Sequence, residues 1–353
     1  MPHPRLFRPI RLLAILATVA ALAALGSCSP RTVGVRFGEA ENSPLLTWPT
    51  PPNRARIKYL ASIATPSDIG ARPSLLRRML NAFTGAVPPR IQQPYGIAVD
   101  SLGRIFVADV AAHGVHRFHP ELGRYDFITA SERPGFRSPI GVAVDERGDL
   151  YVSDSELGVV VVIRPDGRER RRIRAGLQRP TGLAYDARRG LLWVVDTQGH
   201  SIVAFDRDGQ QRAAFGRRGT GEGEFNFPTN IVVAKDGTLY VTDALNFRVQ
   251  VFTPDGAFLR QFGRHGDAVG DLARPKGIAL DSDGHVYVVE GLYDVVNLFD
   301  PEGRPLLSFG SAGHGRGEFW LATGIAIDRQ DRVYVGDSYN GRVQVLQYVA
   351  EGR

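Results

Sequence analysis

One short pattern occurs six times along the chain, and this repeat constrains the fold more than any other feature of the sequence. Each copy has Pro or Ala first, Gly or Asn third, then three mostly apolar residues and usually Asp. The six copies are Pro94–Asp100, Pro139–Asp145, Pro180–Asp186, Pro228–Ala234, Pro275–Asp281 and Ala322–Asp328. Short apolar runs bounded by turn residues are typical of strands, so each copy predicts one β-strand.

A second predicted strand follows each copy and ends in an acidic residue. These acids are Asp109, Asp154, Asp196, Asp243, Glu290 and Asp337. They are separated by 45, 42, 47, 47 and 47 residues. A third strand, a Gly-containing turn and a fourth strand complete most units. Six units of four strands predict an all-β fold, a six-bladed β-propeller of four-stranded blades.

Two Gly-rich linkers carry a family resemblance. Phe215–Phe225 and Phe309–Phe319 resemble the linkers of NHL repeats, and the resemblance covers about residues 91 to 348. The segment Trp48–Pro52 is similar to the entry segment of bacterial six-bladed propeller lipoproteins. The resemblance therefore implies an NHL-type propeller over residues 91–353. It implies no single function, because propellers of this family perform unrelated tasks.

The sixth unit is one strand short of a complete blade. It reaches a turn at Glu351-Gly352, after only three predicted strands. The segment of about 56–63 has strand character and no blade of its own. Because an unpaired sheet edge invites aggregation, we expect this N-terminal strand to close the ring within the last blade.

The first 27 residues are typical of a signal peptide. Arg5, Arg8 and Arg11 precede an apolar run over 12–25 that is too short to span a bilayer comfortably. The sequence Leu25-Gly-Ser-Cys28 resembles a lipobox, which implies lipidation at Cys28. We therefore expect an exported chain anchored to the cell envelope through lipid on Cys28, at the periplasmic face of the outer membrane if the organism is Gram-negative. A plain secretory signal with an incidental cysteine is the alternative.

Further segments separate the signal from the ring. Residues 28–47 are expected to form a polar tether. Residues 48–90 are expected to hold the latch strand and a short helix at about 73–84, with Leu75, Leu76 and Met79 on one face. We expect this helix to pack on the propeller.

Charge and cysteine content exclude some partners. The net charge of +6 includes three Arg of the signal, so removing it leaves 40 basic against 37 acidic residues, or +3. This near balance and the exported location argue against nucleic acid as a partner. With one cysteine in the chain there is no internal disulfide. We expect a monomeric ring stabilised by its repeats.

The repeated acids allow two interpretations. All six lie on the face where the loops before the first strands meet the loops between second and third strands, so they resemble a carboxylate ring for a cation. An acid at the same place in every repeat is more simply explained as a cap that accepts backbone N–H bonds in its own turn. The repetition favours the architectural interpretation.

The residue after each anchor Pro or its equivalent is expected to lie at the mouth of the central channel. These residues are Tyr95, Ile140, Thr181, Thr229, Lys276 and Thr323. Propeller lyases place metal-binding histidines at such a mouth, and none of the six is His. His113 and His200 are expected in turns, and His265, His285 and His314 are scattered. We therefore predict no metal ligands and no catalytic residues.

A polar pocket is the predicted binding site. Its candidate ligand-binding residues are Tyr95, Thr181, Asn230, Lys276 and Thr323. Asn230 replaces the Gly of the other repeats, and Lys276 would contact an anionic or sugar-like ligand. The alternative is that Lys276 is merely solvated.

The chain is thus expected to be a binding platform for a protein, peptide or glycan of the envelope rather than an enzyme. The alternative is a metal-dependent propeller enzyme of lyase, hydrolase or lactonase type, and only that alternative requires a cofactor, zinc or calcium. A run of arginines over Arg168–Arg174 is predicted to form the exposed outer strand of the second blade, where charge protects a sheet edge.

Overall fold

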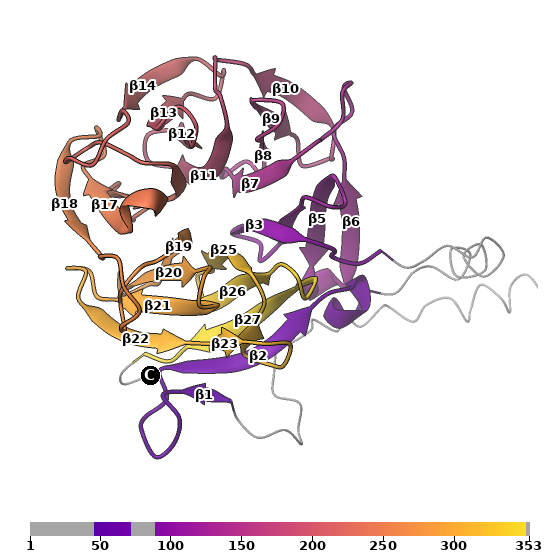
Figure 1. Cartoon of the computed structure of the whole chain (residues 1–353). Coiled ribbons are helices and arrows are strands. Elements are labelled where there is room, and N and C mark those ends of the chain that lie inside the picture. Colours follow the sequence, from indigo (N-terminus) through magenta and orange to yellow (C-terminus); the bar gives the residue numbers. More distant parts are fainter. Residues whose placement is uncertain (1–45, 72–88, 351–353) are drawn as a thin grey trace, which may run out of the picture. The chain divides into compact units, whose positions relative to one another are not determined.

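Six sheets arranged around one axis form the part of the chain that the computed structural model describes, residues 46–71 and 89–350 (Figure 1). Each of the first five sheets is a blade of four antiparallel strands, and the first strand along the chain lies innermost. Alternating apolar and β-branched residues favour these short strands, and Gly-containing turns end them.

The first three blades follow one another along the chain. Blade one holds β3 (Pro94–Val99), β4 (Ile105–Asp109), β5 (Gly114–His119) and β6 (Arg124–Ile128). Blade two holds β7 (Pro139–Val144), β8 (Leu150–Asp154), β9 (Val159–Ile163) and β10 (Glu169–Ile173). Blade three holds β11 (Pro180–Asp186), β12 (Leu191–Asp196), β13 (Ser201–Phe205) and β14 (Gln211–Phe215).

The next two blades repeat this arrangement. Blade four holds β15 (Pro228–Val233), β16 (Leu239–Asp243), β17 (Arg248–Phe252) and β18 (Phe258–Phe262). Blade five holds β19 (Pro275–Leu280), β20 (Val286–Glu290), β21 (Val295–Phe299) and β22 (Pro305–Phe309). The linker to blade six contains a small parallel pair, β23 (Ser311–Ala312) and β24 (Glu318–Phe319). The described helices are 3₁₀ turns: η1 (Pro66–Ile69), η2 (Pro120–Leu122) and η3 (Ala244–Asn246).

Both ends of the described chain build the sixth blade. It holds β25 (Ala322–Ile327), β26 (Arg332–Asp337) and β27 (Arg342–Tyr348), followed outward by β2 (Ile57–Ile63) and β1 (Thr47–Trp48) (Figure 1). Strand β2 pairs with β27 from Ile57 opposite Tyr348 to Ile63 opposite Val343. The predicted six-bladed ring with an N-terminal closing strand is confirmed.

The core consists of layers between neighbouring blades rather than one central cluster. One layer joins the first blade to the last, since Ile97 and Phe118 pack in the same cluster as Tyr334 and Val343. A blade is apolar on both faces, so it can bury its side chains only between two neighbours. The first and last blades can therefore bury their apolar faces only if the ring is closed.

The innermost strands approach one another closely at the third residue of the repeat. A Cβ on Gly141 would lie 2.0 Å from the carbonyl oxygen of Thr181 in the next blade. A Cβ on Gly324 would lie 2.1 Å from the carbonyl oxygen of Tyr95. Both distances are far below van der Waals contact, which explains why Gly recurs at this place.

Several expectations from the sequence concern residues outside the described part. The signal peptide, Cys28, nearly all of the tether and the helix expected at about 73–84 fall there. Thr47, the last residue of the expected tether, lies in β1. No helix among the described residues combines the length and the apolar character needed to cross a membrane.

The ring-closing role of β2 predicts the effect of a substitution in it. Ile57 is fully buried between the fifth and sixth blades, so Ile57→Ala leaves a cavity at the closure. We expect the free energy of unfolding to fall by about 2–5 kcal/mol. Urea denaturation followed by circular dichroism measures this, with the half-buried neighbour change Lys58→Ala as a control of small effect. An Ile57→Ala protein as stable as its control would contradict the closure.

Candidate functional site

The repeated acids are buried and hold two segments of their own blade together. The Asp154 carboxylate accepts hydrogen bonds from the backbone N–H of Leu157, in the turn that follows it, at 3.0 Å. It also accepts from the backbone N–H groups of Arg137 at 2.7 Å and Ser138 at 3.2 Å, just before the first strand. The prediction that these acids cap their own turns is confirmed. They also bind the segment before the first strand of the blade, which was not predicted. These bonds occupy the oxygen lone pairs that a cation would need.

In the first blade, a histidine contributes to the same arrangement. His116, which is buried, places its Nε2 3.0 Å from the Asp109 carboxylate. Burial raises the pKa of Asp109. The hydrogen bonds from His116 and from three backbone N–H groups outweigh burial, so the pKa lies below its ordinary value. Asp109 is therefore a structural carboxylate that stays ionised.

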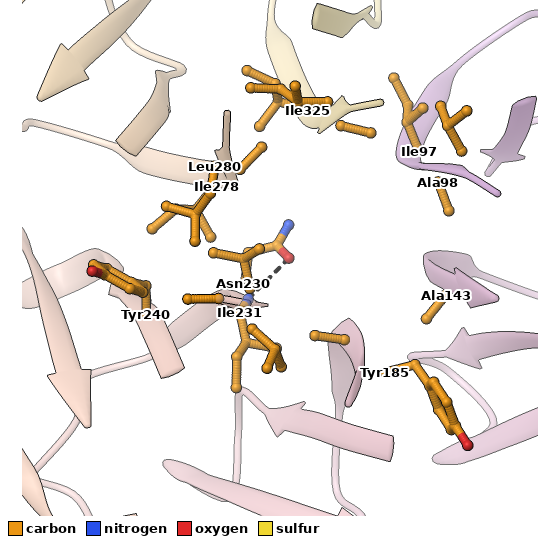
Figure 2. Close-up of a pocket in the computed structure, with 18 of the residues that line it drawn as sticks. Ile97, Ala98, Ala143, Tyr185, Asn230, Ile231, Tyr240, Ile278, Leu280 and Ile325 are labelled. Carbon is orange, nitrogen blue, oxygen red and sulfur yellow. Dashed lines mark hydrogen bonds between the residues drawn. The ribbon is translucent and has the colours of Figure 1, made fainter. Parts of the chain in front are cut away.

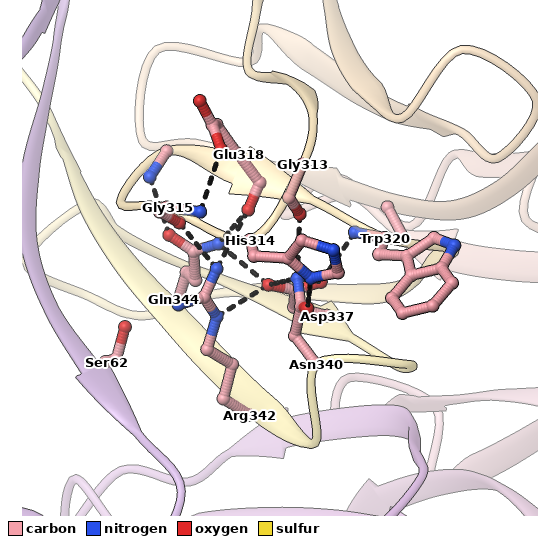
Figure 3. Close-up of polar contacts among 12 residues, drawn as sticks. Ser62, Gly313, His314, Gly315, Glu318, Trp320, Asp337, Asn340, Arg342 and Gln344 are labelled. Carbon is pink, nitrogen blue, oxygen red and sulfur yellow. Dashed lines mark hydrogen bonds and ion pairs between the residues drawn. The ribbon is translucent and has the colours of Figure 1, made fainter.

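Blades four and six extend the cap into the Gly-rich linkers, and Figure 3 shows the arrangement in blade six. The Asp337 carboxylate accepts from Arg342 Nε at 2.7 Å and from Gln344 Nε2 at 2.9 Å. Both side chains also donate to the carbonyl oxygen of Glu318 in the linker. Arg248 and Gln250 make the equivalent bonds in blade four. The linkers that resemble NHL repeats are thus fixed by side chains.

Backbone hydrogen bonds bring two sets of loops side by side. In every blade but the fourth, the N–H of the residue after the repeated acid donates to a carbonyl just before the first strand of the same blade, as Thr197 does to Arg179 at 3.0 Å. Gly291 donates to Arg274 at 3.1 Å in the same way. In blade four, Leu245 donates to Asn226 at 3.0 Å. These loops and the residues before the innermost strands therefore share one face around the channel, which we call the mouth face.

Two of the predicted site residues use their hydroxyl groups to join blades. Thr181 Oγ1 lies 3.0 Å from the carbonyl oxygen of Thr229, to which it donates, and 2.7 Å from Thr197 Oγ1. Thr323 Oγ1 donates to the carbonyl oxygen of Pro94 at 3.0 Å. Both side chains are buried. They connect neighbouring inner strands, a role that was not predicted from the sequence.

Lys276 is the buried cation of the mouth face. Its side chain is 9% exposed and makes no ion pair or hydrogen bond with any residue that the structure describes. Burial and, to a lesser extent, the charge of Arg274 lower the pKa of Lys276 to about 8, although Asp294 and Glu290 act in the opposite direction. A buried ammonium group in such surroundings favours an anion arriving from outside.

Arg274 lies near this cation, and Arg179 and Tyr95 belong to the same mouth face. Arg179 and Arg274 directly precede the innermost strands of blades three and five, and both are exposed. Their side chains have no hydrogen bond or ion pair within the described ranges. Burial raises the pKa of Tyr95 in blade one, and the charges of both arginines oppose that rise. Three blades therefore bring Tyr95, Arg179 and Arg274 close to one another.

Neither arginine was among the site residues predicted from the sequence. The signal that could have found them was the dipeptide Arg-Pro at the start of two repeats, at 179–180 and 274–275. The residue before the anchor Pro faces the mouth as the residue after it does. A search restricted to the position after the Pro therefore misses the residues before the Pro, which lie on the same mouth face.

Asn230 lies in a different place from the other predicted residues. It lines a cavity of ≈ 640 Å³ within the channel, walled by apolar residues such as Ile97, Ile278 and Ile325 (Figure 2). The cavity extends to the turns around Asp236 and Asp283, at the opposite end of the inner strands from the mouth face. The Asn230 side chain points toward the middle of the channel (Figure 2). Its Oδ1 accepts from the N–H of Ile231 at 3.0 Å.

The histidines do not converge. His113 and His200 have left-handed backbones, with φ of 52° and 51°, and their Nδ1 atoms hydrogen-bond backbone carbonyls. This agrees with their expected place in turns. Among the described residues, no group of three or more His, Cys, Asp or Glu side chains is placed to hold a metal ion.

The arginine run of blade two differs in part from its prediction. Strand β10 is the outer strand, as expected. The Arg172 side chain is only 2% exposed, however, and pairs with Glu169 at 2.6 Å. Arg170 pairs with Asp149 at 2.7 Å. The expectation of a uniformly exposed strand was wrong, because acids and backbone carbonyls of neighbouring loops reach these guanidinium groups.

Two sequence families match parts of the chain. The SMP-30/Gluconolactonase/LRE-like region matches residues 142–267, and the NHL repeat matches residues 319–346. No curated protein matches the chain. The observed sheets make the chain a six-bladed β-propeller, and parts of it are similar to the NHL repeat and to the SMP-30/Gluconolactonase/LRE-like region.

Solved structures with different properties share this fold. Virginiamycin B lyase from Staphylococcus aureus is 15% identical, with a TM-score of 0.55 over 73% of this chain and 96% of that one. An auxiliary nutrient binding protein from Bacteroides thetaiotaomicron is 11% identical, with a TM-score of 0.59 over 73% of this chain and 69% of that one. At such identities the likeness concerns the fold alone.

The buried charge of Lys276 predicts a stability cost that depends on pH. Because its pKa is about 8 in the folded protein against an ordinary 10.5, the charge opposes folding below pH 8 and stops doing so as pH rises toward 10.5. We expect Lys276→Met to raise the free energy of unfolding at pH 7 by up to about 3 kcal/mol. The gain should vanish above about pH 10.5.

Chemical denaturation across pH measures this difference, with Lys58→Met in β2 as the matched control. A Lys276→Met protein less stable than wild type at pH 7 would show that the ammonium has an internal partner.

Proposed function

We propose that the chain is an envelope-anchored binding platform whose mouth face takes an anionic group of a protein, peptide or glycan ligand. The observation that carries this proposal is the largely buried side chain of Lys276, whose ammonium group has no hydrogen bond or ion pair among the described residues and lies near Arg274. Arg179 and Tyr95 add a third cation and a hydroxyl from two other blades. Carboxylate, phosphate and sulfate groups all suit such a set of donors.

The two carboxylates that act on Lys276 accept hydrogen bonds from backbone N–H groups. Glu290 accepts the backbone N–H groups of Ala273 and Arg274 at 2.8–2.9 Å. Asp294 accepts the N–H of Ala322 at 2.9 Å. An incoming anion therefore meets cations whose nearest acids are held by the backbone. This arrangement supports binding rather than proton transfer, since both of these carboxylates are committed to backbone groups.

Ligand binding should depend on these cations and on pH. A fluorescein-labelled tetraglutamate peptide, followed by anisotropy at low salt, serves as the anionic probe. We expect Lys276→Met and Arg274→Met each to weaken binding about tenfold, as the loss of one charge-assisted bond predicts. Affinity should also fall as pH rises through about 8, because Lys276 loses its charge.

Arg168→Met, an exposed change before β10, is the matched control and should leave affinity unchanged. Equal binding by all variants would refute the site. The metal-dependent enzyme is tested in the same preparations: stoichiometric zinc or calcium that disappears on substitution of mouth-face residues would favour it.

The envelope anchor rests on the sequence around Cys28 and needs a separate test. Cells expressing the protein are labelled with an alkyne fatty acid and then fractionated. We expect label and membrane association in the wild type and loss of both in Cys28→Ser. Absence of label from the wild-type protein would leave the secretory alternative.

A further inference from the structure

The mouth face of blades four to six exposes large apolar side chains. We call this set the apolar arc: Leu245, Leu292, Tyr293, Trp320 and Tyr339. Their exposed fractions are 50, 56, 43, 48 and 56% respectively. Exposing this much apolar surface is unfavourable at roughly 25 cal/mol per Å². Contiguous patches of this kind mark interaction sites.

The architecture of the blade does not require these residues. Leu245, Leu292 and Tyr339 each lie two positions after a repeated acid. The equivalent exposed positions of blades one to three hold Ala111, Glu156 and Gln198. The same turn therefore accepts small, charged and polar residues. The large apolar residues of blades four to six are thus not needed for folding, and we attribute them to an interaction on this side of the ring.

Contacts within the mouth face join the Leu292 part of the arc to the cations. The loop that carries Leu292 is tied to Arg274 by the Gly291 N–H bond at 3.1 Å. A Cβ on Gly291 would lie 2.6 Å from Lys276 Cε, so the lysine chain runs against this loop. Tyr339 donates its N–H to the carbonyl oxygen of Trp320 at 3.0 Å, and the two rings are 5.4 Å apart. Leu292 is thus adjacent to the cations, and Trp320 and Tyr339 form an edge-to-face pair on the same face.

The charges and side-chain types of this surface indicate which class of partner it can bind. Arg274 and Lys276 favour a carboxylate, and the arc favours apolar side chains beside it. The two leucines of the arc favour apolar side chains of a peptide, whereas Tyr293, Trp320 and Tyr339 carry rings on which a sugar could also stack. A second copy of this chain is a poor complement, because the nearby acids Glu290 and Asp294 are held by backbone N–H groups.

We infer that this surface docks a segment of another protein that carries a carboxylate flanked by aromatic or aliphatic side chains. The inference rests on the proposed anion site and names its partner class. The carboxylate lies at Lys276 and Arg274, and the flanking side chains cover Leu292, Trp320 and Tyr339.

The test is a selection of random 12-residue peptides on phage against the purified full-length protein. We expect enriched peptides to contain an acidic residue within a few positions of aromatic or aliphatic residues. Synthetic copies should bind at least tenfold more weakly to Leu292→Ser and Tyr339→Ser. Leu102→Ser, in an exposed turn of blade one on the opposite face, is the matched control and should bind as wild type does.

The outcomes separate this inference from the proposed function. One outcome is that tetraglutamate binds through Lys276 while the selected peptides bind Leu292→Ser and Tyr339→Ser with wild-type affinity. In that case the inferred partner class is wrong and the proposed anion site is retained. If neither probe depends on Lys276, both fail. Arc-dependent binding of uronic-acid oligosaccharides instead of peptides would also overturn the inference. So would arc-dependent dimerisation in light scattering, or peptide binding that appears only when residues 72–88 are deleted.

Discussion

Burial of every blade between two neighbours is the constraint on which this molecule depends. Each layer of the core belongs to two sheets, as the cluster of Ile97, Phe118, Tyr334 and Val343 shows at the closure. A ring that opened at β2 and β27 would expose apolar surface on both the first and the last blade. The N-terminal strand therefore stabilises the whole ring, although it precedes every repeat in the sequence.

The same constraint explains why most polar residues of the mouth face are structural. Inner strands that pack closely leave backbone groups that need partners. Thr181 and Thr323 bond such groups across blades, and acids such as Asp154 bond them within a blade. Lys276 does neither, and it is largely buried near Arg274. This departure from the structural chemistry of the repeat makes Lys276 the candidate binding group.

The architecture could be predicted well from the sequence because the same strand pattern occurs in six repeats. Strand order, the closing strand and the capping acids all followed from spacing. The site was harder to predict, because the repeat shows which residues share a level but not which ones face one another. Arg179 and Arg274 are 95 positions apart, and only the ring places them around one tyrosine. The roles of Thr181 and Thr323 depend on carbonyl groups of neighbouring blades, which the sequence pattern does not position.

The charge state of one ammonium group is central to the proposed binding site. An NMR titration of protein labelled with ¹³C and ¹⁵N in lysine, with the Lys276 signal assigned by Lys276→Met, measures its pKa directly. We predict a pKa near 8 in the free protein. We also predict a clear rise when the tetraglutamate peptide binds, because a bound carboxylate favours the charged form. A pKa near its ordinary value of 10.5, unchanged by the peptide, would contradict the proposed site.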